Sequence, residues 1–145
     1  MGKKFIVKDF IIITLLTSIW VNISELIRFF AYVKPEMQSF LSGVPNVMPM
    51  NEVGILLIWG AWDTLLSALY VYLFWLCAQV FGNNRKSIWM SGIMSWAFFF
   101  VLFWVASANM NLASWSSLLI VLPLTLLETV VATFIASKLY RWRNL

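Results

Sequence analysis

The stretch Phe10–Val33, FIIITLLTSIWVNISELIRFFAYV, decides the fold of this chain. It is about 24 residues long, and an α-helix needs ~20 apolar residues to cross the hydrocarbon core of a bilayer. Nevertheless it carries Asn22, Glu25 and Arg28 at a depth where lipid would surround them. Ionisable groups in hydrocarbon are costly and usually face a protein interior, a partner charge or a water-filled cavity. These three side chains are therefore expected to point into a helix bundle.

The polar residues of this stretch recur at helical spacing. Thr14, Ser18, Asn22, Glu25 and Arg28 follow one another in steps of four, four, three and three. At 3.6 residues per turn, such steps keep side chains on one side of an α-helix. The pattern predicts a polar stripe on the bundle-facing side of the helix, and Glu25 and Arg28 are close enough on it to form an ion pair.

The composition of the whole chain also indicates a membrane protein. Of its 145 residues, 62% are hydrophobic and only 11% are charged, and the mean hydropathy is +0.87. A soluble domain of this size could not cover its surface with so few polar groups. We therefore predict an all-α integral membrane protein that forms a single domain over residues 1–145.

Four hydrophobic segments predict a bundle of four transmembrane helices. The spans are expected at about residues 10–33, 53–81, 88–107 and 116–139. The third span holds no ionisable residue, and Ser91, Gly92 and Ser95 offer a small-residue surface for close helix contact. In the fourth span, Glu128 lies among threonines, which we expect to satisfy it as a protonated acid.

The segment between the first two spans breaks the hydrophobic pattern. Residues 34–52 contain Pro35, Pro45 and Pro49, and prolines interrupt or end helices. We predict that this is the only long loop and that it caps the bundle on the extracytoplasmic side. Within it, Glu36 to Leu41 is expected to form a short interfacial helical turn.

The basic residues predict the orientation. Three lie in the N-terminal segment, two in the 82–87 turn and three near the C-terminus, whereas Lys34 alone lies outside the membrane on the other face. Cytoplasmic loops carry an excess of Lys and Arg, so both termini are predicted to be cytoplasmic. We therefore attribute the net charge of +4 to basic residues that face anionic lipid head groups and not to binding of nucleic acid. We expect a bacterial inner (cytoplasmic) membrane.

With this orientation, polar residues from three spans converge on one layer. Glu25, Arg28 and Asp63 fall in the outer half of the membrane, and Asn22 and Glu128 lie nearer the midplane. Three carboxylates and one guanidinium would carry two negative charges if all were ionised. Since Glu25 can pair with Arg28, Asp63 and Glu128 need a proton, a cation or another donor. The plainer interpretation is that these groups only hold the bundle together.

Asp63 is the residue that we expect to act on a ligand. Trp59, Trp62 and Tyr70 lie near it along its own helix, and aromatic faces beside a carboxylate suit an organic cation. Packing is the alternative role for each tryptophan. The predicted ligand-binding residues are Asn22, Glu25, Arg28, Trp59, Trp62, Asp63, Tyr70 and Glu128.

Several kinds of chemistry find no support in the sequence. Histidine is absent and Cys77 is the only cysteine, which removes haem histidines, zinc histidine sites and the usual nucleophile pairs with histidine. We predict no catalytic residue, no metal and no cofactor.

The sequence leaves three functions open. The first is binding, with or without transport, of a small amphiphilic or cationic molecule in an outward-facing intramembrane pocket of polar and aromatic residues. The second is an accessory or structural role, as a subunit of a larger membrane complex or as a homo-oligomer. The third is a membrane enzyme that uses Glu25 or Asp63 as general acid or base on a lipid-like substrate. An enzyme is the least supported, because nothing marks a nucleophile, metal or phosphate site.

Overall fold

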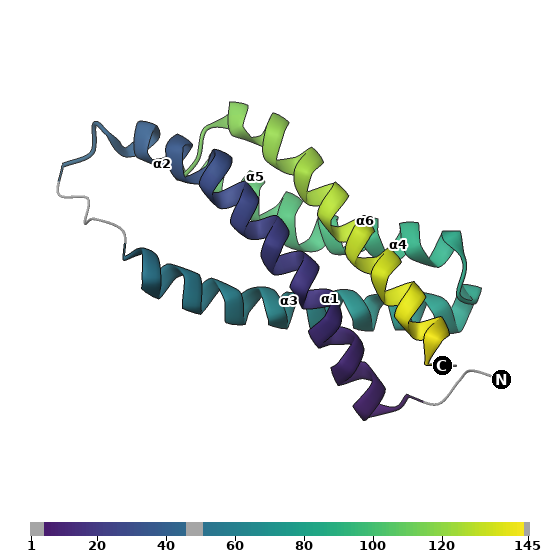
Figure 1. Cartoon of the computed structure of the whole chain (residues 1–145). Helices are drawn as coiled ribbons and strands as arrows, with labels where there is room; N and C mark the ends of the chain where they lie inside the picture. The colour runs from purple at the N-terminus through teal and green to yellow at the C-terminus, as the bar shows by residue number, and fades with distance from the viewer. Residues whose placement is uncertain (1–4, 46–50, 144–145) are drawn as a thin grey trace.

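The chain is all helical in the computed structural model, which describes residues 5–45 and 51–143 apart from the side chain of Glu52. Four long helical rods form the molecule (Figure 1). The first rod comprises α1 (Val7–Arg28), a π-helical turn (Phe29–Val33) and α2 (Lys34–Leu41), and the second is α3 (Glu52–Phe81). The third rod comprises α4 (Arg85–Ser95), a π-helical segment (Trp96–Val101) and α5 (Leu102–Asn109). The fourth comprises a short 3-10 helix (Trp115–Ser117) and α6 (Leu118–Trp142). Each rod is long and apolar enough to cross a membrane, as the sequence predicts.

The first rod is longer than predicted, because the helix does not end at Val33. It continues through Lys34 and Pro35 to Leu41, so the predicted start of the loop at residue 34 is wrong. In the π-helical turn before the proline, the backbone N–H of Lys34 donates to the carbonyl of Phe29, five residues back. Such a widened turn gives the ring of Pro35 room at the start of α2, where its missing N–H costs little. The predicted short helix Glu36–Leu41 is confirmed, as part of this continuation.

The remaining helix ends follow from local chemistry. The side chain of Asn51 caps α3 by accepting from the backbone N–H of Gly54 at 3.0 Å. Asn84 caps α4 by accepting from the backbone N–H groups of Lys86 at 2.9 Å and Ser87 at 3.2 Å. Between them, α3 ends at Gly82, whose φ of +77° is a backbone conformation that glycine adopts without steric cost.

Close packing of α4 on α6 depends on small residues. Ser91, Gly92 and Ser95 are buried, as the sequence predicts. A Cβ atom added at Gly92 would lie 3.1 Å from the Cα of Val130 and 3.2 Å from the hydroxyl of Thr133. Without a hydrophobic driving force inside lipid, such backbone proximity is what stabilises helix pairs.

Two buried apolar clusters fill the bundle. Cluster 1 consists of Ile13, Val71, Phe74, Ala78, Ala136 and Tyr140. Cluster 2 consists of Val21, Leu66, Tyr70, Phe100 and Ala132. Both include residues of α1, α3 and α6, so these helices form the centre of the molecule.

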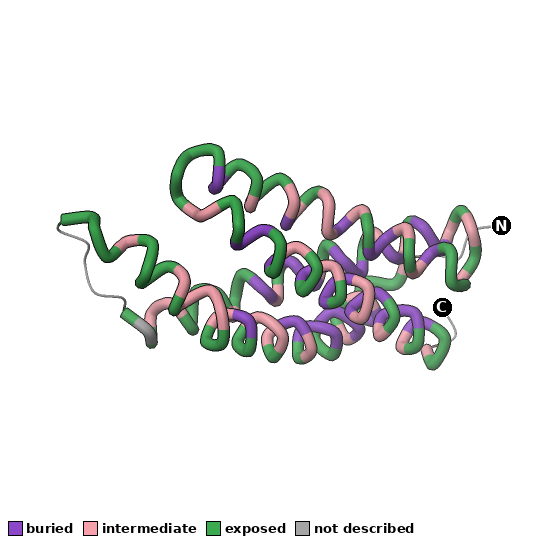
Figure 2. The backbone as a smooth tube through the Cα atoms, turned by 90° about the horizontal axis from the view of Figure 1, so that it is seen from above, coloured by how far each residue is buried: buried purple, intermediate pink, exposed green. Residues whose placement is uncertain are grey.

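The two ends of the bundle differ. At one end, which we call the termini end, Arg143 donates from its Nε to Asp9 at 2.7 Å and so joins the end of α6 to the start of α1. At the other, the loop end, none of the residues from Phe29 to Leu41 or from Val53 to Trp62 is buried. Figure 2 shows the buried residues gathered toward the termini end, with exposed residues over most of the loop end. The loop-end part of α3, Val53–Trp62, is therefore splayed from the bundle over most of its length, whereas α2 is exposed but hydrogen-bonded to the start of the fourth rod through Glu36.

Candidate functional site

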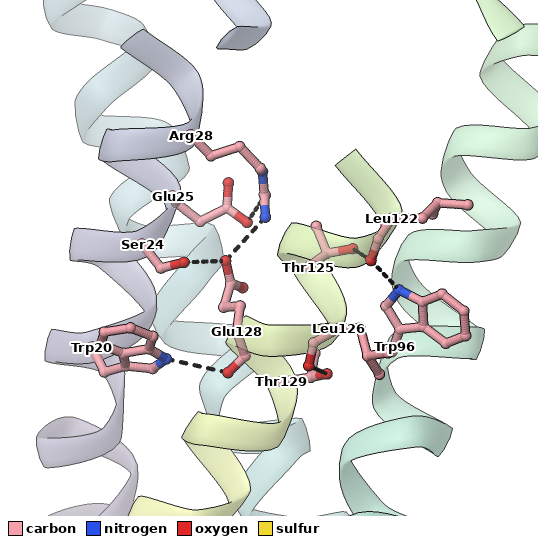
Figure 3. A network of polar contacts seen from close by, with 10 residues as sticks. All are labelled: Trp20, Ser24, Glu25, Arg28, Trp96, Leu122, Thr125, Leu126, Glu128 and Thr129. Carbon is pink, nitrogen blue, oxygen red and sulfur yellow. Dashed lines mark hydrogen bonds and ion pairs between the residues drawn. The ribbon is translucent and has the colours of Figure 1, made fainter. Parts of the chain in front are cut away.

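Arg28 is the centre of the polar layer. Its guanidinium forms an ion pair with Glu25 on its own helix, as the sequence predicts, and its Nη1 donates to Oε2 of Glu128 on α6 at 3.0 Å (Figure 3). Arg28 and Glu128 are buried, with 7% and 0% of their side chains exposed. The layer is therefore a carboxylate–guanidinium–carboxylate arrangement that joins two helices, buried at Arg28 and Glu128 and partly exposed at Glu25.

Two further donors fix Glu128. Ser24 donates from its hydroxyl to Oε2 of Glu128 at 2.9 Å, and the indole N–H of Trp20 donates to its backbone carbonyl at 3.2 Å. The expectation that neighbouring threonines satisfy Glu128 is wrong. The hydroxyls of Thr125 and Thr129 donate to carbonyls of their own helix, because a threonine within a helix reaches the carbonyl three or four residues back.

Asp63 approaches the same layer from α3. It is 4% exposed, and within the described part of the chain its carboxylate has no hydrogen bond and no ion pair. Glu25 and Arg28 are near enough to act on it electrostatically. The Ser67 hydroxyl donates to the backbone carbonyl of Asp63 at 2.7 Å and not to its carboxylate. Asp63 is thus a buried acid without a direct partner.

The aromatic residues expected near Asp63 differ in burial: Tyr70 is fully buried, whereas Trp59 and Trp62 are not. Trp59 and Trp62 are 49% and 51% exposed, because they lie on the splayed part of α3. The aromatic ring that does adjoin the charges belongs to Phe100, whose centroid is 5.1 Å from the guanidinium carbon of Arg28. Phe100 comes from the third rod, and no spacing in the sequence relates it to Arg28.

Asn22 lies at the contact of α1 and α3, outside the ion network. Its side-chain amide donates to the backbone carbonyl of Ser18 at 2.8 Å. Its side-chain oxygen would be 3.3 Å from a Cβ atom at Gly60. Asn22 therefore helps to set the distance between the two helices and does not contact the carboxylates.

Some buried polar atoms at this depth have no partner. Among the described residues, the phenol oxygen of Tyr70 and Oε1 of Glu128 are buried without a hydrogen bond. Tyr70 is fully buried, and its phenol is within electrostatic range of Glu128, Glu25, Arg28 and Asp63. A buried acceptor without a donor costs about 1–3 kcal/mol, and more if it is charged.

The chemistry open to this site follows from its charge. Two carboxylates pair with the Arg28 guanidinium and a third, that of Asp63, lies within electrostatic range, so positive charge is in deficit, and burying unpaired negative charge is strongly unfavourable. The described residues include no group of three or more His, Cys, Asp or Glu side chains arranged to hold a metal ion. A proton or a molecular cation fits the deficit.

Comparisons with known proteins add no function. No family model, no curated protein and no solved structure matches the chain. The interpretation of the site therefore comes from its own residues.

Proposed function

We propose that this chain is a small integral membrane protein that binds, with or without transporting it, a small cationic or amphiphilic molecule at the buried layer of Arg28, Asp63 and Glu128. The observation that carries the proposal is the state of Asp63. Its carboxylate is buried on α3 without a hydrogen bond or ion pair to any described residue, while the guanidinium of Arg28 already pairs with Glu25 and Glu128.

The shape of the bundle supports access from one side. Asp63 stands where α3 passes from its splayed part, Val53–Trp62, into the packed bundle. The termini end below it is filled by cluster 1 and tied by Asp9 and Arg143. A ligand would therefore reach the layer from the loop end, and transport would require cluster 1 to part.

Ligand-dependent stability tests the proposal. The purified protein in lipid nanodiscs is heated with increasing tetraphenylphosphonium or octylamine, because a ligand that binds the folded state raises the unfolding temperature. We expect at least one cation to stabilise the protein and Asp63→Asn to abolish this response while the protein still folds. Asp9→Asn is the matched control, since Asp9 is a buried acid that has its own arginine. An unchanged response in Asp63→Asn would contradict the proposal.

We also propose that both termini are cytoplasmic, that the 34–52 segment caps the extracytoplasmic side, and that the membrane is a bacterial inner membrane. The excess of basic residues at the termini end supports this orientation. A reporter fused after Leu145 should be active only in the cytoplasm, and one inserted at Gly43 only outside. The reverse pattern of reporter activity would mean that the loop end, from which the ligand is proposed to enter, faces the cytoplasm.

A second candidate function is that of an accessory subunit. The splayed part of α3 presents large, mostly exposed apolar side chains, among them Leu57 and Ile58, which are 72% and 71% exposed. A helix of a larger complex, or of a second copy, could pack there. Co-purification of a stoichiometric partner that Leu57→Trp removes would favour this function, and a monomer with an intact ligand response would argue against it.

A further inference from the structure

Asn83 fastens the turn between α3 and α4 to the end of α6. Its side-chain oxygen accepts from the hydroxyl of Ser137 at 2.5 Å, and its side-chain amide donates to the backbone carbonyl of Ser137 at 3.0 Å. Its backbone carbonyl accepts from Nη2 of Arg141 at 2.9 Å. The end of α6 therefore lies beside the first residues of α4, at the termini end of the bundle (Figure 1).

Three basic side chains gather at this turn. Arg85 and Lys86 are the first two residues of α4, and their side chains and that of Arg141 are exposed. We call these three residues the basic turn. Within the described part of the chain, Asp9 is the one acid at the termini end, and it pairs with Arg143. The basic turn therefore has no ion pair with any described residue.

Two contacts hold positive charge at the turn. Nζ of Lys86 lies 4.1 Å from the centroid of the Phe81 ring, which keeps the ammonium beside the end of α3. The guanidinium of Arg141 is held by its bond to the Asn83 carbonyl. A guanidinium has five N–H donors, so that single bond leaves most of them available. The charges of these two residues are thus positioned and still open to an acceptor.

The helix ends that meet here do not balance this charge. A helix C-terminus carries roughly half a negative elementary charge, and a helix N-terminus roughly half a positive one. The C-termini of α3 and α6 and the N-terminus of α4 meet at this turn, so together they supply about half a negative charge. Three basic residues exceed that several times over. An anion from outside the chain fits the difference.

We propose that the basic turn binds the phosphate group of an anionic phospholipid. Arginine binds phosphate through paired N–H donors, and lysine adds a compact charge. A lipid is favoured over free phosphate because apolar side chains flank the turn, with Val80 73% and Trp89 53% exposed, and the membrane-spanning rods end there. This inference goes beyond the proposed function and does not depend on the cation-binding layer, which lies deeper in the bundle.

Unfolding in the presence of two lipids tests the inference. The full chain in an uncharged detergent is titrated with phosphatidylglycerol, which is anionic, or with phosphatidylcholine of the same acyl chains, which has no net charge. Affinities are taken from the unfolding temperature. We expect phosphatidylglycerol to bind about tenfold or more tightly. Arg85→Gln with Lys86→Gln should remove most of this preference, since each basic residue near anionic lipid contributes roughly a factor of five. Arg141→Gln is an independent second variant and should lower the preference about fivefold.

The matched control is Lys8→Gln with Lys138→Gln, which removes the same charge from the same end. Nζ of Lys138 lies 5.3 Å from the centroid of the Phe134 ring, one turn back toward the middle of α6, so it points away from the basic turn. The control should keep the preference for phosphatidylglycerol. Equal binding of the two lipids, or an equal loss of preference in both double variants, would overturn the site. Inorganic phosphate that raises the unfolding temperature as much as phosphatidylglycerol would overturn the lipid as its ligand.

Discussion

The two halves of α3 differ in burial although they belong to one continuous helix. From Val53 to Trp62 no residue is buried, whereas from Asp63 to Ala78 buried residues recur at every turn. Both halves are strongly apolar, so composition does not separate them. The difference arises from packing: the second half carries the residues of α3 that belong to both buried clusters, whereas the first half lies apart from the other helices over most of its length and approaches α1 near Gly60 (Figure 1).

The charged layer lies at the boundary between these halves. Asp63 is the first buried residue of α3 from Val53 onward, and Arg28 is the last buried residue of α1 before the π-helical turn. A buried charge needs partners from several helices, so it belongs where packing is complete. Under the proposed function the layer must also admit a ligand, so it belongs where packing ends. Both conditions are met at this boundary.

The largest effect should come from Arg28→Ala. This change leaves two buried carboxylates without their guanidinium, and breaking a buried ion pair costs about 3–5 kcal/mol. We expect a large fall in the thermal unfolding temperature and in folded yield. Restoring neutrality with Glu25→Gln and Glu128→Gln in the same chain should recover most of the loss, because removing all partners can be close to neutral.

Arg143→Ala is the control for this experiment. Arg143 also pairs with an acid but is 28% exposed, so its loss should cost about 1 kcal/mol or less. Rescue of Arg28→Ala by Glu25→Gln alone would mean that Glu128 does not depend on the arginine. Equal losses for the two arginine variants would mean that water reaches the layer.

The next effect compares the two halves of α3 directly. Leu66→Ala, in cluster 2, should destabilise the protein by about 2–5 kcal/mol, because it leaves a cavity among packed side chains. Leu57→Ala, at a residue that is 72% exposed, should change stability by about 0.5 kcal/mol or less. The unfolding temperatures of the purified variants give the comparison. A strong loss in Leu57→Ala would show that the splayed half is packed in the membrane, against a partner or a second copy.

The fold could be predicted from the sequence because the bilayer restricts the possibilities. Hydrophobic length fixes the number of spans, and only helices satisfy their own backbone in lipid. The extent of the first rod could not be predicted in this way. Pro35 normally ends a helix, but the π-helical turn before it removes the steric conflict, and π-helical turns have no sequence signature as strong as a proline.

The site was predictable where contacts are local and not where they are distant. Glu25 and Arg28 are three residues apart, so helix geometry alone predicts their pair. The contact of Arg28 with Glu128 spans 100 residues and depends on how α1 and α6 cross. Trp62 precedes Asp63 in the sequence but points outward, because adjacent residues of a helix lie about 100° apart.

A smaller effect is expected at Gly92. Replacing it by leucine would push α6 away from α4, since the nearest atoms include the backbone of Val130 at 3.1 Å. Overpacking of this kind costs about 1–3 kcal/mol. Gly43→Leu is the control, because a Cβ at Gly43 meets nothing within 4 Å. Thermal unfolding should separate the two variants, and similar stability would show that the α4–α6 contact can widen freely.

The smallest effect, and the finest comparison of the two ends, concerns Glu36. Its Oε1 accepts from the hydroxyls of Ser114 and Ser117 at 2.9 Å each, and so ties α2 to the start of the fourth rod. Glu36→Gln keeps an accepting oxygen and removes the charge, which should weaken this contact by about 1 kcal/mol. Because no residue of α2 is buried, the loss should appear as faster hydrogen exchange of the amides of residues 36–41 and not as a lower unfolding temperature. Asp9→Asn makes the corresponding change at the termini end, where cluster 1 couples α1 to α6, and it should lower the unfolding temperature instead. If Glu36→Gln lowers the unfolding temperature as much as Asp9→Asn does, the loop end is part of the cooperative core, and a ligand could not enter there without unfolding the bundle.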